Sequence, residues 1–332
     1  MRPGRVTLRR AVACGVMACG LMAAAATVST AADTYPNRPP RLIVPYAPGG
    51  GTDFFARLVA GAMGATLGQQ IVVDNRPGAG TQIGAEAVAH AEPDGYTLLL
   101  GDTSTYASNK ALYRKLSYNP DTDFAPITLT GRFAIVLLVN TNKLKVTSAK
   151  DLIEQARAHP GTIDYASSGI GSPFHLAAEL FAQAAGIRLN HIPYKGAAPA
   201  LQDLAAGQVG MMFIDFATAR SQLQNPGIKA IAVASPGEFA LMPGVPPVAR
   251  DLPGFEAWAW QGFVAPAKTP DAVVGKLHDA YVKAANDPDI RKKANDAGVD
   301  VLQSTPKQMA DYMASESAKW EKVIKTANIH LD

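Results

Sequence analysis

The sequence has only two cysteines, Cys14 and Cys19, and both lie within the first 32 residues. This segment carries four arginines before an apolar run from Ala11 to Ala26, and it ends in small residues at positions 30–32. A basic start, an apolar run and an Ala-x-Ala-like site are typical of a secretory signal peptide, which we expect to be cleaved after Ala32. The mature chain would then have no disulfide, no thiol nucleophile and no cysteine-bound metal.

The sequence also lacks an excess of charge once this segment is removed. Four of the 31 basic residues are lost with the segment, so the rest of the chain has 27 basic and 28 acidic residues and a formal charge of −1. No strongly basic surface is implied, so nucleic acid is not an expected partner. The 300 residues after position 32, in a chain that is 48% apolar, can bury a sizeable core, which we expect to be divided between two domains.

Catalytic motifs are absent as well. The sequence contains no G-x-S-x-G elbow and no H-E-x-x-H pair, and its six histidines are scattered singly. We therefore expect no enzyme, no catalytic residue, no cofactor and no metal site. His175 could orient the loop that precedes it, or it could simply be packed or solvated.

What the sequence does contain is a strand, a glycine loop and a helix near its start. Leu42–Val44 is apolar enough for a buried strand, and Gly49–Gly51 follow in the loop. Thr52 or Asp53 can cap the next helix. Such a loop can direct unpaired backbone N–H groups at a small anion, because the first helical turn has spare donors and a partial positive charge. The alternative is a tight turn in which glycine only avoids steric strain.

The same arrangement recurs about 120 residues later. Ile163–Ala166 is a predicted strand, residues 167–172 form a loop of small residues, and Pro173 suits the first position of a helix. Two helix N-termini, one in each half of the chain, could grip one carboxylate from opposite sides.

Further polar residues follow predicted strands. Strands and helices alternate along the chain, which indicates a largely parallel α/β layer, and such sheets bind ligands at the C-terminal ends of their strands. Thr103 and Ser104 follow one strand, where their hydroxyls could bind a ligand or cap a helix. Asp215 follows the strand Met211–Ile214, where it could hold an ammonium or hydroxyl group or cap the next helix.

Several ordered motifs together resemble the Bug family, the solute-binding components of tripartite tricarboxylate transporters. The resemblance covers essentially all of residues 35–330. It rests on the segments 45–53 (PYAPGGGTD), 75–80 (NRPGAG), 93–98 (PDGYTL), 165–172 (YASSGIGS) and 193–196 (PYKG), and on Lys319-Trp320.

The resemblance implies a type II periplasmic-binding-protein fold, with two α/β lobes joined by two chain crossings and a ligand cleft between them. We expect the crossings near Ile135–Leu138 and Glu256–Gln261. The expected division is a signal peptide at residues 1–32, a discontinuous first lobe at 33–136 with 258–332, and a second lobe at 137–257.

The resemblance also implies that the loops at 46–53 and 167–172 bind one ligand carboxylate from opposite sides. One departure concerns Asp215, because the family often has Asp one position earlier, where this chain has Ile214. A slip of one residue turns a strand side chain to the opposite face, so contact between Asp215 and a ligand is left open. The full set of expected ligand-binding residues is Tyr46, Ala47, Pro48, Gly49, Gly50, Thr52, Asp53, Thr103, Ser104, Ser167, Ser168, Gly169, Gly171, Ser172, Tyr194, Lys195 and Asp215.

The expected function is that of a monomeric periplasmic receptor. It would close on a small carboxylate by hinge motion and deliver it to the membrane permease of a tripartite tricarboxylate transporter. The alternative is a secreted hydrolase, or a binding subunit that feeds a sensor, on the same scaffold. The sequence leaves open which carboxylate binds and whether Arg9-Arg10 directs export by the twin-arginine or the general route.

Overall fold

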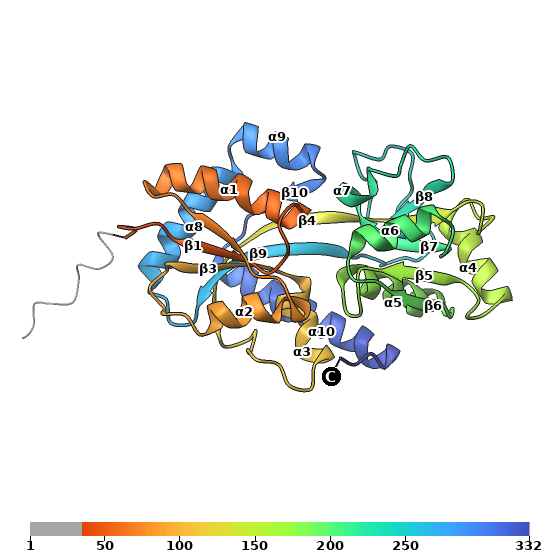
Figure 1. Ribbon diagram of the computed structural model, residues 1–332, viewed down its shortest axis with the longest axis horizontal. Coiled ribbons are helices and arrows are strands. Elements are labelled where there is room, and N and C mark those ends of the chain that lie inside the picture. The colour runs from red at the N-terminus through yellow and green to blue at the C-terminus, as the bar shows by residue number, and fades with distance from the viewer. Residues whose placement is uncertain (1–34, 332) are drawn as a thin grey trace, which may run out of the picture.

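The computed structural model describes residues 35–331, so the predicted signal peptide lies outside the described residues. Helices and strands alternate through most of the chain (Figure 1). The elements up to residue 140 are β1 (Arg41–Val44), α1 (Gly51–Leu67), β2 (Val72–Asn75), η1 (Ala79–Thr81), α2 (Gln82–Ala89), β3 (Thr97–Asp102), η2 (Ser104–Ser108), α3 (Asn109–Leu112) and β4 (Phe124–Asn140).

The rest of the chain first builds a second lobe and then returns to the first (Figure 1). The second lobe holds α4 (Ala149–Ala158), β5 (Asp164–Ser167), α5 (Pro173–Ala185), β6 (Asn190–Pro193), α6 (Ala197–Ala205), β7 (Met211–Asp215), α7 (Phe216–Ala219), β8 (Ile228–Val233) and η3 (Val248–Arg250). The returning segment holds β9 (Trp258–Pro266), α8 (Asp271–Ala285), α9 (Pro288–Asp296), β10 (Val299–Val301) and α10 (Pro306–Ala327).

One continuous sheet joins the two lobes. Its strand order is β2-β1-β3-β9-β4-β7-β5-β6, and both β8 and β10 pair with β4 in addition. The pairs β1–β2, β1–β3, β5–β6 and β5–β7 are parallel, as the alternation of elements predicted. The pair β3–β9 and the pairs of β4 with β7, β8, β9 and β10 are antiparallel, so the sheet is mixed and not largely parallel. Figure 1 shows β4 and β9 running through the middle of the molecule, between the lobes.

The strand pairings change where the chain passes between the lobes. Strand β4 pairs with β9 as far as Ala134 and with β7 from Ile135 onward. On the returning segment, the Ala257 N–H still donates to Ala234 of the second lobe, whereas β9 begins at Trp258. The pairings thus change at 134/135 and at 257/258, whereas the division into lobes at 136/137 and 257/258 stays a prediction.

The first lobe forms because β1 and α1 share one apolar core. Leu42, Ile43 and Val44 are buried on β1, and α1 buries one side through Phe55 and Val59. The helix ends at Gly68, whose left-handed φ of 71° is the usual glycine conformation after a helix. Burial on both faces of the sheet fixes the strand, and with it the position of the loop that follows.

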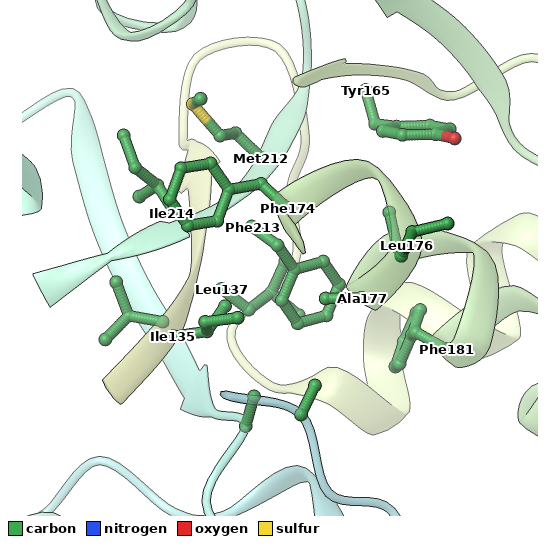
Figure 2. Packing of buried hydrophobic residues seen from close by; sticks show 14 of the residues in the cluster. Ile135, Leu137, Tyr165, Phe174, Leu176, Ala177, Phe181, Met212, Phe213 and Ile214 are labelled. Atoms are coloured by element: carbon green, nitrogen blue, oxygen red, sulfur yellow. The ribbon is translucent and has the colours of Figure 1, made fainter. Parts of the chain in front are cut away.

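The core of the second lobe holds α5 against the central strands (Figure 2). Phe181 of α5 packs against Phe213 of β7, with ring centroids 5.6 Å apart. Ile214 is fully buried in the same cluster, and Figure 2 shows it beside β4. The core thus fixes the end of β7 as well as the start of α5.

Two features are absent from residues 35–331. None of the helices there combines the length and apolarity needed to span a membrane. The same residues hold no group of three His, Cys, Asp or Glu side chains arranged to ligate a metal ion.

Candidate functional site

The first glycine loop is held by side chains that bond to its backbone. Asn75, at the end of β2, donates to the carbonyl of Tyr46 at 3.0 Å and to the Asp53 carboxylate at 2.9 Å. Asp53 also accepts the Gly49 N–H at 2.9 Å and pairs with Arg57. Burial alone would raise the pKa of Asp53, but these hydrogen bonds hold it below its usual value. Asp53 therefore shapes the loop as a buried carboxylate.

The first turn of α1 has no side-chain cap. Its N-cap residue is Gly50, and no side chain bonds to the backbone N–H groups there. The two residues expected to cap the helix are engaged elsewhere, because Asp53 holds the loop and the Thr52 hydroxyl accepts from the Gln261 amide on β9. The helix therefore presents spare donors and the positive end of its dipole, which is a favourable place for an anion.

Tyr46 and Ser104 lie together beside a buried acid. The Tyr46 hydroxyl donates to Asp102, and the Ser104 side chain is near enough to Tyr46 to act on the pKa of its hydroxyl, which burial raises. Burial raises the pKa of Asp102, although bonds from Tyr46 and Thr105 partly offset that effect. The neighbouring Thr103 is fully buried, and its hydroxyl accepts the Trp260 N–H at 3.3 Å. Of the two hydroxyls expected at this strand end, Ser104 lies beside the loop, and Thr103 ties β3 to β9.

The second loop, residues 167–172, rests on two stacked histidines. The rings of His175 and His191 are parallel, with centroids 3.9 Å apart. The Gly171 N–H donates to His175 Nδ1 at 3.0 Å, and the Ser167 hydroxyl bonds to His191 Nε2 at 2.7 Å. Burial lowers the pKa of His175 to about 3 and that of His191 to about 4, so both rings are neutral at pH 7. His175 thus orients the loop, as one of the two interpretations of the sequence proposed.

The second loop offers fewer donors than the first. The Ser172 hydroxyl caps α5 by accepting the His175 N–H at 3.3 Å, and Pro173 has no N–H. The N–H of Gly169 bonds to the Ser167 hydroxyl. The Ser168 hydroxyl has no hydrogen-bond partner within residues 35–331, so it is free for a ligand.

Three other expected residues have different surroundings. The Tyr194 hydroxyl donates to Asp203 of α6 at 2.7 Å, and Lys195 is exposed. The Asp215 carboxylate accepts the N–H and the hydroxyl of Thr218, each at 2.8 Å, and so caps α7. The structure therefore supports the capping alternative for Asp215.

The expected residues fall into two groups in space. Gly49, Gly50 and Gly51 line a cavity of about 450 Å³ whose far wall is α7. Residues 167–172 are not part of that wall. They lie instead against α3, where the Leu112 side chain is 2.3 Å from the place of a Cβ on Gly171. Contact of both loops with one carboxylate thus stays a prediction.

The sequence reasoning missed the residues that support these loops. Asn75 lay inside a motif of the family resemblance and could have been found as an amide that follows an apolar run. His191 and Gln261 gave no such signal, because each meets its partner only in the folded chain. The Gln261 Oε1 atom is buried without a partner within residues 35–331.

Comparisons with known proteins agree with this architecture. The profile of a family described as "Tripartite tricarboxylate transporter family receptor" matches residues 55–329. The protein BugT of Bordetella pertussis is 35% identical over 302 residues, covering 90% of this chain and 92% of BugT. A protein from the tcbD-tcbE intergenic region of Pseudomonas sp. strain P51 is 36% identical over 294 residues, covering 88% of this chain and 87% of that protein.

Solved structures are similar over nearly their whole length. Rpa4515 of R. palustris, solved with adipate, has a TM-score of 0.81 and 35% identity, covering 89% of this chain and 99% of that one. MatC of Rhodopseudomonas palustris, solved with bound malate, has a TM-score of 0.77 and 34% identity, covering 87% of this chain and 100% of that one. Both similarities extend across the two lobes.

Proposed function

Because the chain belongs to the tripartite tricarboxylate transporter receptor family, we propose that it captures a small carboxylate between its two lobes and delivers it to a membrane permease. Members of this family are periplasmic solute-binding proteins and not enzymes. In this proposal the protein acts as a monomer in the periplasm after cleavage of the signal peptide near Ala32. The lobes close on the ligand by bending at the crossings near residues 134–135 and 257–258.

The observation that carries the proposal is the uncapped first turn of α1 at the wall of a cavity. A carboxylate placed there accepts N–H bonds from Gly51 and Thr52, and such bonds to a charged acceptor contribute about 1.5–3 kcal/mol each. Asp53 supports this geometry, because it holds the loop with its own bonds and leaves the helix donors free. The hydroxyls of Ser104 and Ser168 are the proposed additional donors.

Binding of organic acids is expected to raise the melting temperature. A ligand that binds only the folded state adds about 2.7 kcal/mol at about 100 times its dissociation constant. A thermal-shift screen of acetate, malate, adipate and aromatic acids measures this, with neutral sugars and ammonium salts as controls. If sugars or cations shift the transition and no carboxylate does, the proposed function is wrong.

A further inference from the structure

The two lobes contact each other on both sides of the crossing strands β4 and β9 (Figure 1). Below these strands in Figure 1, Gln183 of α5 donates to the Val323 carbonyl of α10 at 2.9 Å. Above them, α7 and Arg220 contact the end of α9 and the residues that lead into β10. Arg220 and Ala297 both line the cavity beside the first glycine loop. A movement that parts the lobes at this cavity therefore breaks the contact of α7 with α9.

The last turn of α9 is completed from the other lobe. The N–H groups of Ala297 and Gly298 donate to carbonyls of that turn. The Asp296 carbonyl accepts from the guanidinium of Arg220, in the second lobe, at 2.6 Å. A helix C-terminus has carbonyls without intrahelical partners and a partial negative charge, so a cation that bonds there stabilises it. Arg220 thus joins a charged group of one lobe to a helix end of the other.

Three acidic residues adjoin the lining of the cavity in sequence, and each of them pairs with a cation of its own lobe. These pairs are Asp53–Arg57, Asp296–Lys292 and Asp300–Arg132, with N···O distances of 2.9, 2.6 and 2.8 Å. Arg220 forms no ion pair with a carboxylate of residues 35–331. Its bond across the lobes therefore depends on the position of the α9 backbone, and not on a carboxylate that has another partner.

Phe216, the first residue of α7, packs against the same part of the first lobe. A Cβ on Gly298 would lie 2.6 Å from the Cδ1 atom of Phe216, so the ring rests directly on the glycine backbone. Gly298 has a φ of +79°, a conformation that favours glycine. Within its own lobe, the Phe216 ring packs edge-on against Phe239, with centroids 5.2 Å apart. The second lobe thus places one aromatic ring and one cation on the residues between α9 and β10.

The position of α7 is fixed to the central sheet. Asp215 is the last residue of β7, and its carboxylate caps α7 by accepting the N–H and the hydroxyl of Thr218, each at 2.8 Å. Asp215 also lies opposite Ile135 in the ladder of β7 and β4. Because the cap joins α7 to β7, we expect Phe216 and Arg220 to move with the second lobe as one body.

From these contacts we infer that α7 and Arg220 form a latch that stabilises the closed arrangement, in which the lobes meet at this cavity. The latch consists of the Arg220 bond to Asp296 and the contact of Phe216 with Gly298. Opening at the cavity breaks both, and neither needs a ligand. A ligand held between the lobes binds the closed arrangement, so the latch strengthens the binding of every such ligand by the same factor. This effect on affinity rests on the proposed function, whereas the latch itself does not.

The test measures the separation of the lobes without ligand. Spin labels are placed at Ala65→Cys on α1 and Gln224→Cys after α7, which are exposed positions in the two lobes. Cys14→Ser and Cys19→Ser remove the native thiols. Distances between the labels, measured by double electron–electron resonance, give the ratio of open to closed molecules.

Arg220→Met is expected to raise the ratio of open to closed molecules by about tenfold, because a hydrogen bond from a charged donor is lost. Arg220→Lys should raise it by less than about threefold, since its ammonium group can still donate to the Asp296 carbonyl. Arg188→Met removes the same charge from an exposed position outside the cavity and should leave the ratio unchanged. A distance distribution of Arg220→Met equal to that of the wild type would overturn the latch, as would equal effects of the Met and Lys substitutions.

Calorimetric titration with malate and with adipate then measures the effect on binding. Arg220→Met should weaken both acids by one common factor, equal to the fall in the closed fraction. A loss confined to one acid would mean that Arg220 recognises the ligand directly, and the latch would be wrong as the cause. If no carboxylate bound the wild type, the proposed function would fail, and the distances between the labels would still decide whether the latch exists.

Discussion

Replacing Glu316 with alanine is expected to lower the free energy of unfolding by about 4 kcal/mol. Glu316 lies on α10 and is only 7% exposed. One of its carboxylate oxygens accepts the indole N–H of Trp260 at 3.0 Å and that of Trp320 at 2.8 Å. Both indoles are fully buried, so alanine would leave two donors without partners. A buried donor without a partner costs about 1–3 kcal/mol, and the Lys319 ion pair is lost as well.

Urea denaturation followed by circular dichroism measures this loss. Glu316→Gln is the control, because its amide oxygen can still accept from both indoles, and we expect it to lose about 1–2 kcal/mol at most. The loss should appear as a lower urea concentration at the midpoint of unfolding. The slope of the free energy of unfolding against urea concentration should be unchanged. An alanine variant as stable as the wild type would show that α10 and β9 do not depend on this carboxylate.

Replacing Gly50 with valine is expected to weaken carboxylate binding by about 100-fold. Gly50 has φ of −82° and ψ of 172°, an extended conformation that valine adopts readily. No atom lies within 4 Å of the place of a Cβ there, so the fold can accept the side chain. The methyl groups would occupy the space in front of the first turn of α1. Loss of two N–H bonds at about 1.5 kcal/mol each corresponds to about 100-fold.

The measurement is calorimetric titration with an organic acid that binds the wild type. Gly61→Val is the matched control, because Gly61 is an exposed position in the middle of α1 where a Cβ also meets nothing within 4 Å. Gly171 is unsuitable for the same test, since its φ is +76° and a Cβ there would meet Leu112 at 2.3 Å. Unchanged affinity in a folded Gly50→Val protein would mean that the carboxylate binds elsewhere.

The short parallel strands and the loops after them could be predicted from local sequence, because apolar runs and glycine loops are signals within a few residues. Strand β4 could be predicted only in its second half, Ala134–Val139. Its first half, from Phe124, contains Pro126, threonines and Gly131, and its register shifts twice against β9. Its extended conformation there depends on β9 and β10, which are distant in sequence, and a local pattern does not carry that information.

The positions of the two loops of the candidate site could be predicted, but the roles of their side chains could not. The glycine loops after β1 and β5 are where the sequence placed them. The role of Thr52 could not be predicted, because its hydroxyl bonds to Gln261, which is 209 residues away. Capping rules likewise assigned Asp53 to the helix, whereas Asn75 and Arg57 draw its carboxylate into the loop. Local rules give the hydrogen bonds that a polar side chain could form, and tertiary contacts determine which of them it forms.

The position of the carboxylate is measured most directly by NMR of the backbone amides while hexanedioate is titrated into the wild-type protein. If the ligand rests on the first turn of α1, the amide protons of Gly51 and Thr52 should move downfield and saturate with the affinity measured by calorimetry. The amide of Gly61, on the same helix, should not move. Saturable shifts confined to other parts of the protein, with Gly51 and Thr52 unchanged, would contradict a carboxylate site at this helix terminus.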